Sequence, residues 1–514
     1  MAEHIYDKAE LIKRFDAILG KCLKDIDTVG FFEKLRFMEL QKGVVGTFIE
    51  NCVLGYESDT KQDADLLVVE NNKRVKTELK STGMVLKSSP QNHFEAKEPM
   101  SITAVGVYDI ADEVFETSHF WNKLEHLLLV YYHYTANHPV SPYEYCEFPI
   151  TGYEFHEFSD DEKTALKQDW EHVHALVSKV VSHHPGDKTR EWKEAVRKEY
   201  IDVHGELRQV LSYIDLAPKF PPRFRLKRPI VSTIISNHFG QTLEQLPGKY
   251  TVVTDIDLKC KELTEKYSGM TISEIGQSLG ITLTKDNKAI AEQLIIAMFG
   301  GTSSKLNQIE LFQKFGVIAK SITVTPKGTK TEDMKLFHID FDEVTRKEMV
   351  GEDGIVRPMQ FEDSDFYSYF ADHEFICILF EEPSKEDITN NQERKSLLMN
   401  KFIGFKRLVF SDKFIDETVK PVWLDIREKI FNNTLVDVIQ KNKDGSNKLL
   451  ACGEISSAPN FMKSQENDIF IRGAGSDSSS KHKIESVNGI KMLPQYVWLK
   501  GNAVIKELSR VPKL

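Results

Sequence analysis

The sequence has few cysteines, and they show no sign of a metal site or a disulfide framework. The 514 residues contain six cysteines, which are far apart and never form a C-x-x-C pair, and this argues against a zinc ribbon or a redox pair. The longest apolar runs, such as 127–132 and 375–380, are far too short to cross a bilayer. The polar, acidic N-terminus is unlike a signal peptide. These absences predict a soluble cytoplasmic protein with reduced thiols and no membrane partner.

Basic residues are also in the minority. The chain has 67 basic and 78 acidic residues, which gives a net charge of −11. An acidic total does not forbid a nucleic-acid partner, but any basic surface must then be local. One such surface is predicted over 219–228, which contains no acid and five cations: Lys219, Arg223, Arg225, Lys227 and Arg228. We favour a DNA contact over a solvated cationic turn.

Hydrophobic spacing predicts a mixed α/β chain. Apolar residues recur at helical spacing over 44–54, and Gly55 is placed to end that helix. Over 63–80, two β-rich runs flank Asn71-Asn72, which indicates a hairpin. Further along, the pattern predicts strands at 102–108 and 127–132, helices at 116–124 and 160–181, and a loop at 182–192.

An internal repeat runs through the chain. Five blocks of the first half have counterparts in the same order in the second half: TFIENCVLG with QLIIAMFG, VKTELKSTG with FGVIAKSIT, FETSHFW with FEDSDFY, LKQDW with VKPVW, and PRFRLK with QYVWLK. Chance matches would seldom stay colinear over five blocks. The repeat predicts two related domains, 1–240 and 255–514, joined by a linker over 241–254. Such a pair imitates a two-fold dimer.

Three charged residues of the hairpin have the spacing of a metal-dependent nuclease. Asp65 opens one strand, and Glu78 and Lys80 lie two apart on the same face of the other strand. The two carboxylates and the backbone carbonyl of Leu79 are an oxygen set suited to Mg²⁺. Lys80 can assist an attacking water and offset phosphate charge. Asp63 is an alternative to Asp65, which we prefer because it directly precedes the strand.

The D-x(n)-E-x-K pattern is weak by itself. E-x-K recurs at Glu95–Lys97, and a strand face with alternating charges is commonly just solvated. Two further residues support a site. Glu50 follows apolar residues on the helix 44–54 and could lean toward a metal rather than toward solvent. Lys123 precedes the apolar strand and could contact a phosphate, although a solvated lysine at a helix end is the commoner case.

Taken in order, these segments resemble the MutH family of endonucleases. GTFIENCVLG, then D-x(12)-ELK, FETSHFWNKLEHLLLVYY, QDWE and RFRLKR carry the resemblance. It implies a restriction-endonuclease fold, with two tandem domains as in the family's two-domain type II restriction enzymes. It also implies Mg²⁺-dependent cleavage of double-stranded DNA, usually at GATC. Asp65, Glu78 and Lys80 match the family's catalytic triplet, Glu50 its helix glutamate, and Lys123 a further active-site lysine.

The second half keeps the pattern without the acids. Where the first half has its helix glutamate, its strand glutamate and its further lysine, the second half has Ile295, Ile318 and Tyr369. Lys320 remains, and Glu310 lies near the expected position of the aspartate. Because isoleucine cannot ligate a metal, this half should keep the fold and lose the chemistry. The resemblance implies that it binds a second DNA copy as an effector.

Three functions therefore compete. The first is a type II restriction endonuclease, a monomer in isolation that can pair on DNA. The second is a DNA-binding repair or regulatory protein that does not cut, and the loss of the triplet from only one half argues against it. The third is a mismatch-repair nickase, which the large second domain disfavours.

The polar segment 473–483 is expected to be a loop. The second half has a looser basic set: Arg472, Lys481, Lys483, Lys491 and Lys500.

Overall fold

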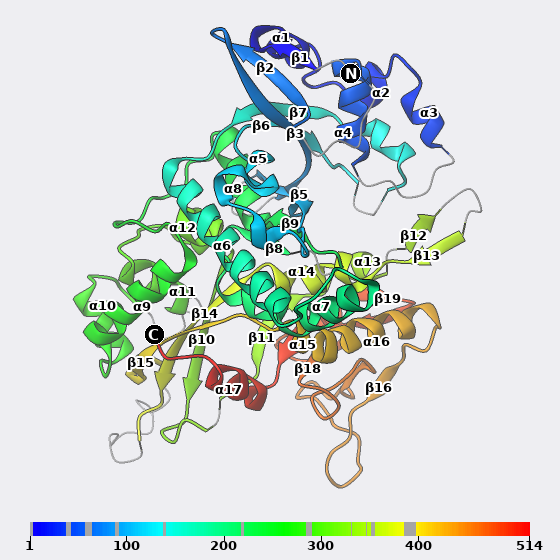
Figure 1. Ribbon diagram of the computed structural model, residues 1–514. Helices are drawn as coiled ribbons and strands as arrows, with labels where there is room; N and C mark the ends of the chain where they lie inside the picture. Colours follow the sequence, from blue (N-terminus) through cyan, green and yellow to red (C-terminus); the bar gives the residue numbers. More distant parts are fainter. Residues whose placement is uncertain are drawn as a thin grey trace. The chain divides into compact units, whose positions relative to one another are not determined.

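The computed structural model describes most of the chain, and its residues form two compact units (Figure 1). The described residues are 4–36, 43–56, 64–87, 92–136, 140–216, 220–283, 290–329, 331–345, 347–350, 355–384 and 397–514. The first unit comprises the described parts of Met1–Ile256, Asn307–Gly316 and Glu348–Arg357. The second comprises those of Asp257–Leu306, Val317–Lys347 and Pro358–Leu514. Two short segments from later in the chain, Asn307–Gly316 and Glu348–Arg357, thus belong to the first unit, which a division by chain order does not predict.

The larger sheet of the first unit has the strand order β1-β2-β3-β6-β7, with β4 also paired to β3. The strands are β1 (Ile5–Asp7), β2 (Leu66–Glu70), β3 (Lys73–Lys87), β4 (His93–Ala96), β6 (Leu127–His133) and β7 (Ile150–His156). The predicted β2–β3 hairpin is confirmed. Asn71 and Asn72 have φ of 49° and 63°, the left-handed conformations that a tight two-residue hairpin loop requires.

Strand β3 changes its partner partway along. It pairs antiparallel with β2 as far as Thr77 and parallel with β6 from Glu78 onward. Leu79 belongs to a hydrophobic core with Phe15, Phe48 and Leu128. Because side chains alternate across a strand, Glu78 lies on the face of β3 that is turned away from this core. The change of partner therefore places Glu78 beside the point where β2 begins.

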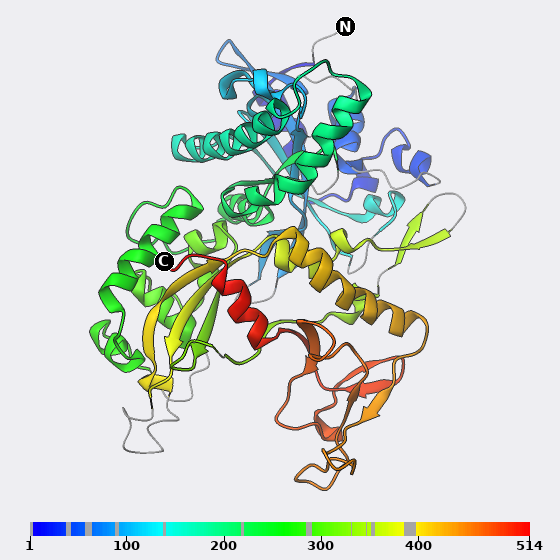
Figure 2. The ribbon, with the colours of Figure 1, turned by 60° about the horizontal axis from the view of Figure 1, so that its bottom comes forward.

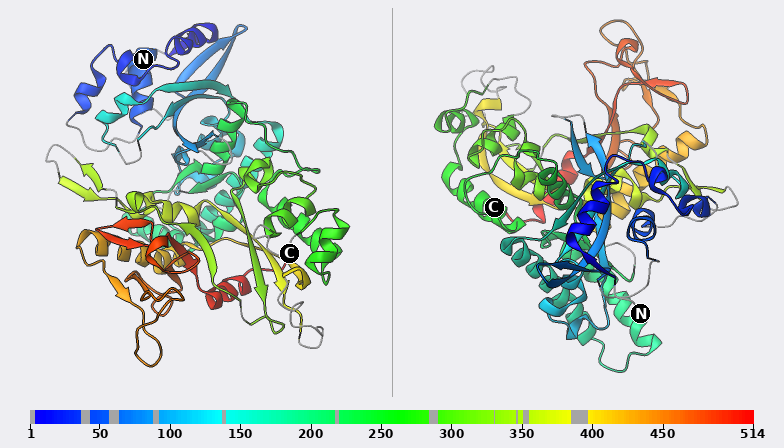
Figure 3. Two further views of the ribbon diagram at one scale, coloured as in Figure 1. Left: turned by 180° about the vertical axis from the view of Figure 1, so that it is seen from behind. Right: turned by 90° about the horizontal axis from the view of Figure 1, so that it is seen from above.

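A smaller sheet and several helices complete the first unit. The sheet has the order β5-β9-β8, from β5 (Met100–Ala104), β9 (Arg223–Leu226) and β8 (Ile214–Leu216). Helix α1 lies beside β1 and β2 (Figure 3). The helices are α1 (Lys8–Asp16), α2 (Leu23–Ile26), α3 (Phe31–Leu35), α4 (Val44–Phe48), η1 (Ile49–Leu54), η2 (Ile110–Asp112), η3 (Phe115–Thr117), α5 (His119–Asn122), η4 (Tyr143–Glu147), α6 (Asp160–Ser182), α7 (Arg190–Val203), η5 (His204–Gln209), α8 (Arg228–His238) and α12 (Glu310–Lys314).

Several predicted boundaries shift. The helix expected over 44–54 is α4 followed by the π-helical turn η1, and it ends at Gly55, whose φ is 86°. The strand expected over 102–108 is β5, which begins earlier and ends at Ala104. The helix expected over 116–124 is a 3₁₀ turn followed by the short α5. The loop expected over 182–192 is shorter, because α7 already begins at Arg190.

The second unit contains two three-stranded sheets, β10-β14-β15 and β11-β21-β18. In this unit α17 contacts β15 and α16 contacts β18 (Figure 2). The strands are β10 (Val317–Val324), β11 (Met334–His338), β14 (Glu374–Glu381), β15 (Lys401–Leu408), β16 (Asp437–Ile439), β17 (Ser457–Pro459), β18 (Ile469–Gly473), β19 (Glu485–Val487), β20 (Ile490–Met492) and β21 (Gln495–Leu499). Strands β12 (Lys347–Val350) and β13 (Ile355–Pro358) form a two-stranded sheet, most of which belongs to the first unit.

The helices of the second unit are mostly short. None of the helices among the described residues has the length and apolar character needed to cross a membrane. Helix α9 (Val253–Tyr267) begins in the first unit and continues into the second. The turn η6 (Leu306–Gln308) begins in the second unit and continues into the first. The others are α10 (Ile272–Ser278), α11 (Ile290–Met298), α13 (Phe341–Val344), η7 (Phe361–Asp363), α14 (Asp365–Ala371), η9 (Leu397–Met399), α15 (Asp412–Phe414), η10 (Ile415–Val419), α16 (Lys420–Phe431), η11 (Ser480–His482) and α17 (Gly501–Ser509).

The two units have matching strand pairings. Strand β10 runs parallel to β14, which is antiparallel to β15, and β3, β6 and β7 pair in the same order and directions. In the smaller sheets, β9 and β21 are each central and antiparallel to both neighbours. The helix caps match too: Ser118 accepts a hydrogen bond from Trp121 N at 3.1 Å, and Ser364 accepts one from Tyr367 N at 3.1 Å.

Candidate active site

The site begins where β3 leaves β2. Glu78 N donates to the carbonyl of His126, next to β6, at 2.9 Å. Leu79 N points to the opposite edge of β3 and donates to Asp65 Oδ2 at 3.0 Å. The N–H and C=O of one strand residue point to the same side, so the carbonyl of Leu79 also faces the edge where Asp65 lies. The side chain of Asp65 thus accepts a hydrogen bond from β3 just beyond the last paired residues of the β2–β3 ladder, Leu66 and Thr77.

Glu78 is held between two lysines. Its side chain is nearly buried, with 4% of its surface exposed. Lys80 Nζ lies 2.7 Å from Glu78 Oε1, as expected for residues two apart on one strand face. Lys123 Nζ lies 2.7 Å from Glu78 Oε2 and 3.9 Å from Asp65 Oδ1. Four of the five predicted catalytic side chains therefore form one contiguous cluster.

Short local structure delivers Lys123 to this cluster. Ser118 caps α5 and its hydroxyl also donates to the carbonyl of Phe115 at 2.8 Å. Helix α5 ends at Asn122, and Lys123 follows as its C-cap residue before the buried strand β6. The lysine is buried, with 11% of its side chain exposed. Lysines at the end of a helix are more often exposed to solvent, but Lys123 is not.

The two carboxylates share one poorly solvated place. Burial, and then the charge of Glu78, raise the pKa of Asp65 to about 7, although Lys123 and Lys80 oppose the shift. Two carboxylates in such a place ionise together only when cations compensate them. Lys123 and Lys80 supply part of that compensation, but burial and the charge of Glu78 outweigh them at Asp65. A further cation bound at this edge would therefore stabilise the ionised form of the two carboxylates.

The donors fit Mg²⁺, the ion predicted from the sequence. Among the described residues, no three His, Cys, Asp or Glu side chains gather as a metal site. Magnesium is nevertheless commonly bound through one or two carboxylates, with waters and substrate phosphates completing its shell. Asp65, Glu78 and the carbonyl of Leu79 offer that minimal set of hard oxygen ligands.

Tyr56 lies within the electrostatic influence of Glu50, Asp65 and Glu78. Glu50 lies half-buried in the first turn of η1, and its carbonyl accepts hydrogen bonds from Gly55 N at 2.8 Å and Tyr56 N at 3.0 Å. The buried hydroxyl of Tyr56 has no hydrogen-bond partner among the described residues. Burial, and then the charges of Glu50, Asp65 and Glu78, raise the pKa of Tyr56. The three carboxylates therefore act on one phenol.

Sequence reasoning missed Tyr56. Its ring stacks on that of His4, with 3.9 Å between centroids, which fixes it against the N-terminal strand. The sequence offers one signal, the position directly after Gly55, where the chain must turn out of the helix that carries Glu50. No motif marks an aromatic residue there.

Two members of the basic run make internal contacts. Arg225 donates two hydrogen bonds to the carboxylate of Asp215, from Nε at 2.9 Å and from Nη2 at 2.7 Å. Lys227 Nζ donates to the carbonyl of Leu211 at 2.6 Å. These contacts join β8 to β9 and fix the two cations in place.

The other three cations of the run are placed differently. Arg223 is exposed at the start of β9, and Arg228 is the half-buried first residue of α8. Lys219 lies outside the described residues. Asp63, the alternative to Asp65, also lies outside them, so the geometry described above is that of Asp65.

The QDWE segment has a structural role. Asp169 on α6 is fully buried and accepts backbone hydrogen bonds from Ser212, Tyr213 and Ile214 at 2.6–3.0 Å. It therefore holds the start of β8 beside α6. Trp170, the next residue, packs edge-on against Phe115, with 5.9 Å between centroids.

The counterpart positions in the second unit are apolar or differently bonded. Ile295 is buried, and Ile318 packs partly buried against the core. Tyr369 packs against Phe337. Lys320 Nζ donates to the carbonyl of Lys335 at 2.8 Å, and burial lowers the pKa of Lys320 to about 8.

Glu310 does not take the position of the aspartate. It is the first residue of α12 and belongs to the first unit, where α12 packs against α8. Its carboxylate accepts a hydrogen bond from Gln245. The prediction from chain order is wrong at this position because Asn307–Gly316, which includes Glu310, packs in the first unit.

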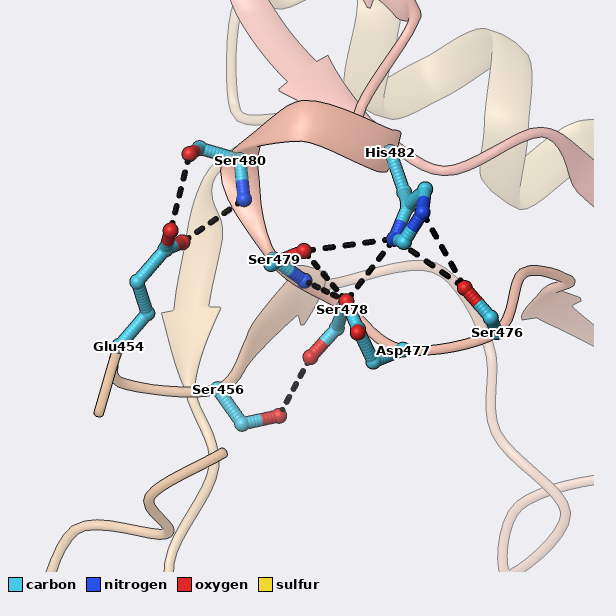
Figure 4. A network of polar contacts seen from close by, with 8 residues as sticks. All are labelled: Glu454, Ser456, Ser476, Asp477, Ser478, Ser479, Ser480 and His482. Atoms are coloured by element: carbon cyan, nitrogen blue, oxygen red, sulfur yellow. Dashed lines mark hydrogen bonds and ion pairs between the residues drawn. The ribbon is translucent and has the colours of Figure 1, made fainter. Parts of the chain in front are cut away.

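Hydrogen bonds to Asp477 hold the polar segment 473–483 in place (Figure 4). Asp477 accepts hydrogen bonds from Ser479 N at 2.9 Å and from the Ser479 hydroxyl, and it lies 2.9 Å from His482 Nδ1. The contacts with Ser479, and then with His482, hold the pKa of Asp477 well below its usual range. Lys483 pairs with Asp437 at 2.9 Å. The segment is a bonded turn rather than a strand or a long helix.

Comparison with known proteins found one family match and one distant relative. Residues 54–169 match the MutH family, described as the DNA mismatch repair enzyme MutH, so the chain carries a MutH-family nuclease domain. Asp65, Glu78, Lys80 and Lys123 lie inside the matched range, and Glu50 lies just before it. The chain is also distantly related to the type II restriction enzyme Sau3AI of Staphylococcus aureus. The two are 20% identical over 389 residues, which cover 72% of this chain and 73% of that enzyme.

Proposed function

We propose that the chain is a Mg²⁺-dependent type II restriction endonuclease that hydrolyses double-stranded DNA at a short specific site. One observation carries the proposal: Asp65, Glu78, Lys80 and Lys123 meet where β3 changes its partner. The distant relationship to a type II restriction enzyme supports this class. The family resemblance supports GATC as the first site to test.

Each side chain has a part in this chemistry. A divalent cation held by Asp65, Glu78 and the Leu79 carbonyl would polarise the scissile phosphate and acidify a water. Lys80 is 20% exposed, so its ammonium can reach the attacking water or a phosphate oxygen. Lys123 is more buried and fixes Glu78 through its other oxygen. Because charge grows on the phosphate as water attacks, two fixed ammonium groups stabilise the transition state.

Plasmid cleavage tests this proposal. Glu78→Ala and Lys80→Ala should each abolish Mg²⁺-dependent cleavage of plasmid DNA. The chain offers a matched control in its second E-x-K triplet, so Glu95→Ala and Lys97→Ala should leave cleavage unchanged. Loss of cleavage in all four variants, or in none, would remove these residues from the active site. DNA binding without any cleavage by the wild type would favour a non-cutting regulator.

We further propose that the second unit is a degenerate repeat of the first. The shared strand pairings of β3-β6-β7 and β10-β14-β15 support this, as do the equivalent Ser118 and Ser364 caps. The repeat would bind a second DNA copy as an effector. Adding a duplex that contains the site but resists cleavage should then accelerate plasmid cleavage at low concentration and compete at high concentration. Competition at every concentration would contradict the effector role.

A mismatch-repair nickase is the second candidate, because the matched family is described as a mismatch repair enzyme. It predicts nicked circles as the end product of a plasmid digest. A restriction enzyme converts the same plasmid to linear DNA with ends at one sequence.

A further inference from the structure

A cationic cavity of about 500 Å³ lies in the first unit, outside the carboxylate cluster. We call it the α7 cavity. It carries four cations and one acid, on a chain whose net charge is −11. Its volume is within the range of roughly 300–1,000 Å³ that is usual for ligand sites. The lining residues are Tyr108, Lys188, Arg190, Lys193, Glu194, Arg197 and Phe220.

One face of α7 builds the cationic wall. Arg190, Lys193 and Arg197 follow one another at spacings of three and four residues, so their side chains share a face of the helix. Thr189 caps the helix by accepting from Trp192 N at 3.2 Å. The wall therefore starts at the positive end of the α7 dipole.

Aromatic rings are interleaved with these cations. Lys193 Nζ lies 5.5 Å from the centroid of the Tyr108 ring. The guanidinium of Arg197 lies 5.5 Å from the centroid of the Phe220 ring. Both rings are only partly buried. Flat apolar surfaces between cations suit a nucleic-acid backbone, because its sugars can contact the rings while its phosphates contact the cations.

The cavity keeps positive charge after its internal pairs are formed. Lys188 pairs with Asp109, and Arg197 lies 3.6 Å from Glu194. Within the described parts of the chain, neither Arg190 nor Lys193 forms an ion pair with an acid, and both are exposed. These two cations are therefore available to an anionic ligand.

We propose that the α7 cavity binds the sugar-phosphate backbone of DNA that flanks the cleaved site. This rests on the proposed function. Arg190 and Lys193 contact phosphates, while Tyr108 and Phe220 contact the sugars. The contact carries no sequence information by itself. It adds affinity, and it orients the duplex in the first unit.

The test measures DNA binding against salt without divalent metal. A fluorescent duplex containing the cleavage site and long flanks is titrated by anisotropy, with wild type and with Arg190→Ala/Lys193→Ala. Each phosphate contact contributes about 0.9 to the slope of log affinity against log salt. The variant should therefore bind more weakly, with a slope shallower by about 2. A duplex without flanks should bind both proteins equally.

The control removes equal charge outside the cavity. Lys179→Ala/Lys198→Ala takes two exposed lysines from α6 and α7 and should keep the wild-type slope. An equal loss of slope in this control would reduce the effect to net charge and overturn the proposal. Circular dichroism melting of both variants identifies any loss of folding, and a variant that melts early is replaced by the charge-reversing Lys193→Glu alone.

The remaining outcomes separate the cavity from the nuclease function. If wild type neither binds the duplex nor cuts it with Mg²⁺, the proposed function fails and the cavity proposal falls with it; if it cuts but does not bind in this assay, only the cavity proposal is wrong. If wild type binds and cuts while Arg190→Ala/Lys193→Ala keeps the same affinity and slope, only the cavity proposal is wrong. A third arm follows the fluorescence of Trp192, whose ring lies 5.5 Å from that of Tyr108. A response to a free deoxynucleotide that duplex DNA does not displace would assign the cavity to nucleotides and overturn the backbone proposal.

Discussion

Glu78 is charged, buried and doubly paired, and this combination ties the stability of the site to its chemistry. Each of its two oxygens contacts a different lysine at 2.7 Å. A buried carboxylate left without its partner keeps its desolvation cost and loses the attraction that offsets it. Substitutions here should therefore act on folding as well as on cleavage, and the two effects must be measured separately.

Lys123→Met should lower the free energy of unfolding by about 2–3 kcal/mol, because Glu78 keeps only Lys80. This is somewhat less than the roughly 3–5 kcal/mol typical of a buried charge that loses its only partner. Urea unfolding measures the change. The double variant Glu78→Gln/Lys123→Met removes both charges and should be more stable than the sum of the single effects predicts. Simple additivity would mean that the two side chains do not interact.

Asp65 gives the metal-free protein a pH-dependent stability. Its pKa is about 7 in the folded state, against an ordinary value of 3.8. The folded protein therefore holds a proton that the unfolded chain has lost, so stability is full below pH 4 and falls as the pH rises toward and through 7. The total loss is up to about 4 kcal/mol.

Asp65→Asn should flatten this profile. Between pH 5 and pH 8 the wild type should lose unfolding free energy, and the variant should lose less. At pH 8, Mg²⁺ should restore stability to the wild type and have little effect on the variant, because a ligand that binds only the folded state stabilises it. Equal stabilisation of both proteins by Mg²⁺ would place the ion elsewhere.

The residues of the site were predictable to the extent that they are local. Glu78 and Lys80 share a face because they are two apart on a strand, and the E-x-K spacing states that directly. The contact of Lys123 with Glu78 spans 45 residues, so the sequence could indicate it only through the family resemblance. The place of Tyr56 beside three carboxylates follows from packing on His4, which no local pattern encodes.

Elements were predicted best where a turn or a cap defined them. The Asn71-Asn72 hairpin is an example, because both asparagines tolerate the left-handed backbone that the turn requires. The change of partner along β3 was not predictable, because alternation of side chains looks the same beside either neighbour. It is this change that lets Asp65 reach Leu79 N and so creates the site.

Asp169 supports an element rather than the chemistry, and its removal should show this. Asp169→Ala leaves the N–H groups of Ser212, Tyr213 and Ile214 buried without their acceptor. Each orphaned group costs about 1–3 kcal/mol, so the variant should unfold at a much lower urea concentration. Glu171→Ala, an exposed change two residues along α6, is the control and should be neutral. A stable Asp169→Ala protein would contradict the assignment.

At the scale of the whole molecule, chain order and packing divide the protein differently. The repeated blocks marked the strands that pair alike in the two units, such as β9 and β21. They did not mark α12, whose residues come from the second half and pack in the first unit. There Gln313 donates to Ser236 at 2.9 Å, and Lys314 lies 3.4 Å from Glu162. The repeat proposed from the sequence follows chain order, whereas tertiary contacts decide which unit a connecting segment joins.

The proposed nuclease function also makes a prediction about how the whole molecule would cut a duplex. If the second unit is the degenerate repeat that we propose, Ile295 and Ile318 correspond to the positions of Glu50 and Glu78, and the proposed acids occur in the first unit alone. Isoleucine offers no oxygen to a metal, so one chain should cut one strand at a time.

A supercoiled plasmid with a single site should therefore pass through an open-circular intermediate, and linear DNA should appear later. Cutting of the second strand should rise more steeply than protein concentration if it requires a second chain. Agarose gels of a time course at several protein concentrations measure both rates. Linear DNA formed without an open-circular stage at the lowest concentration would mean that a single chain cuts both strands, and a second set of catalytic groups would then have to be sought.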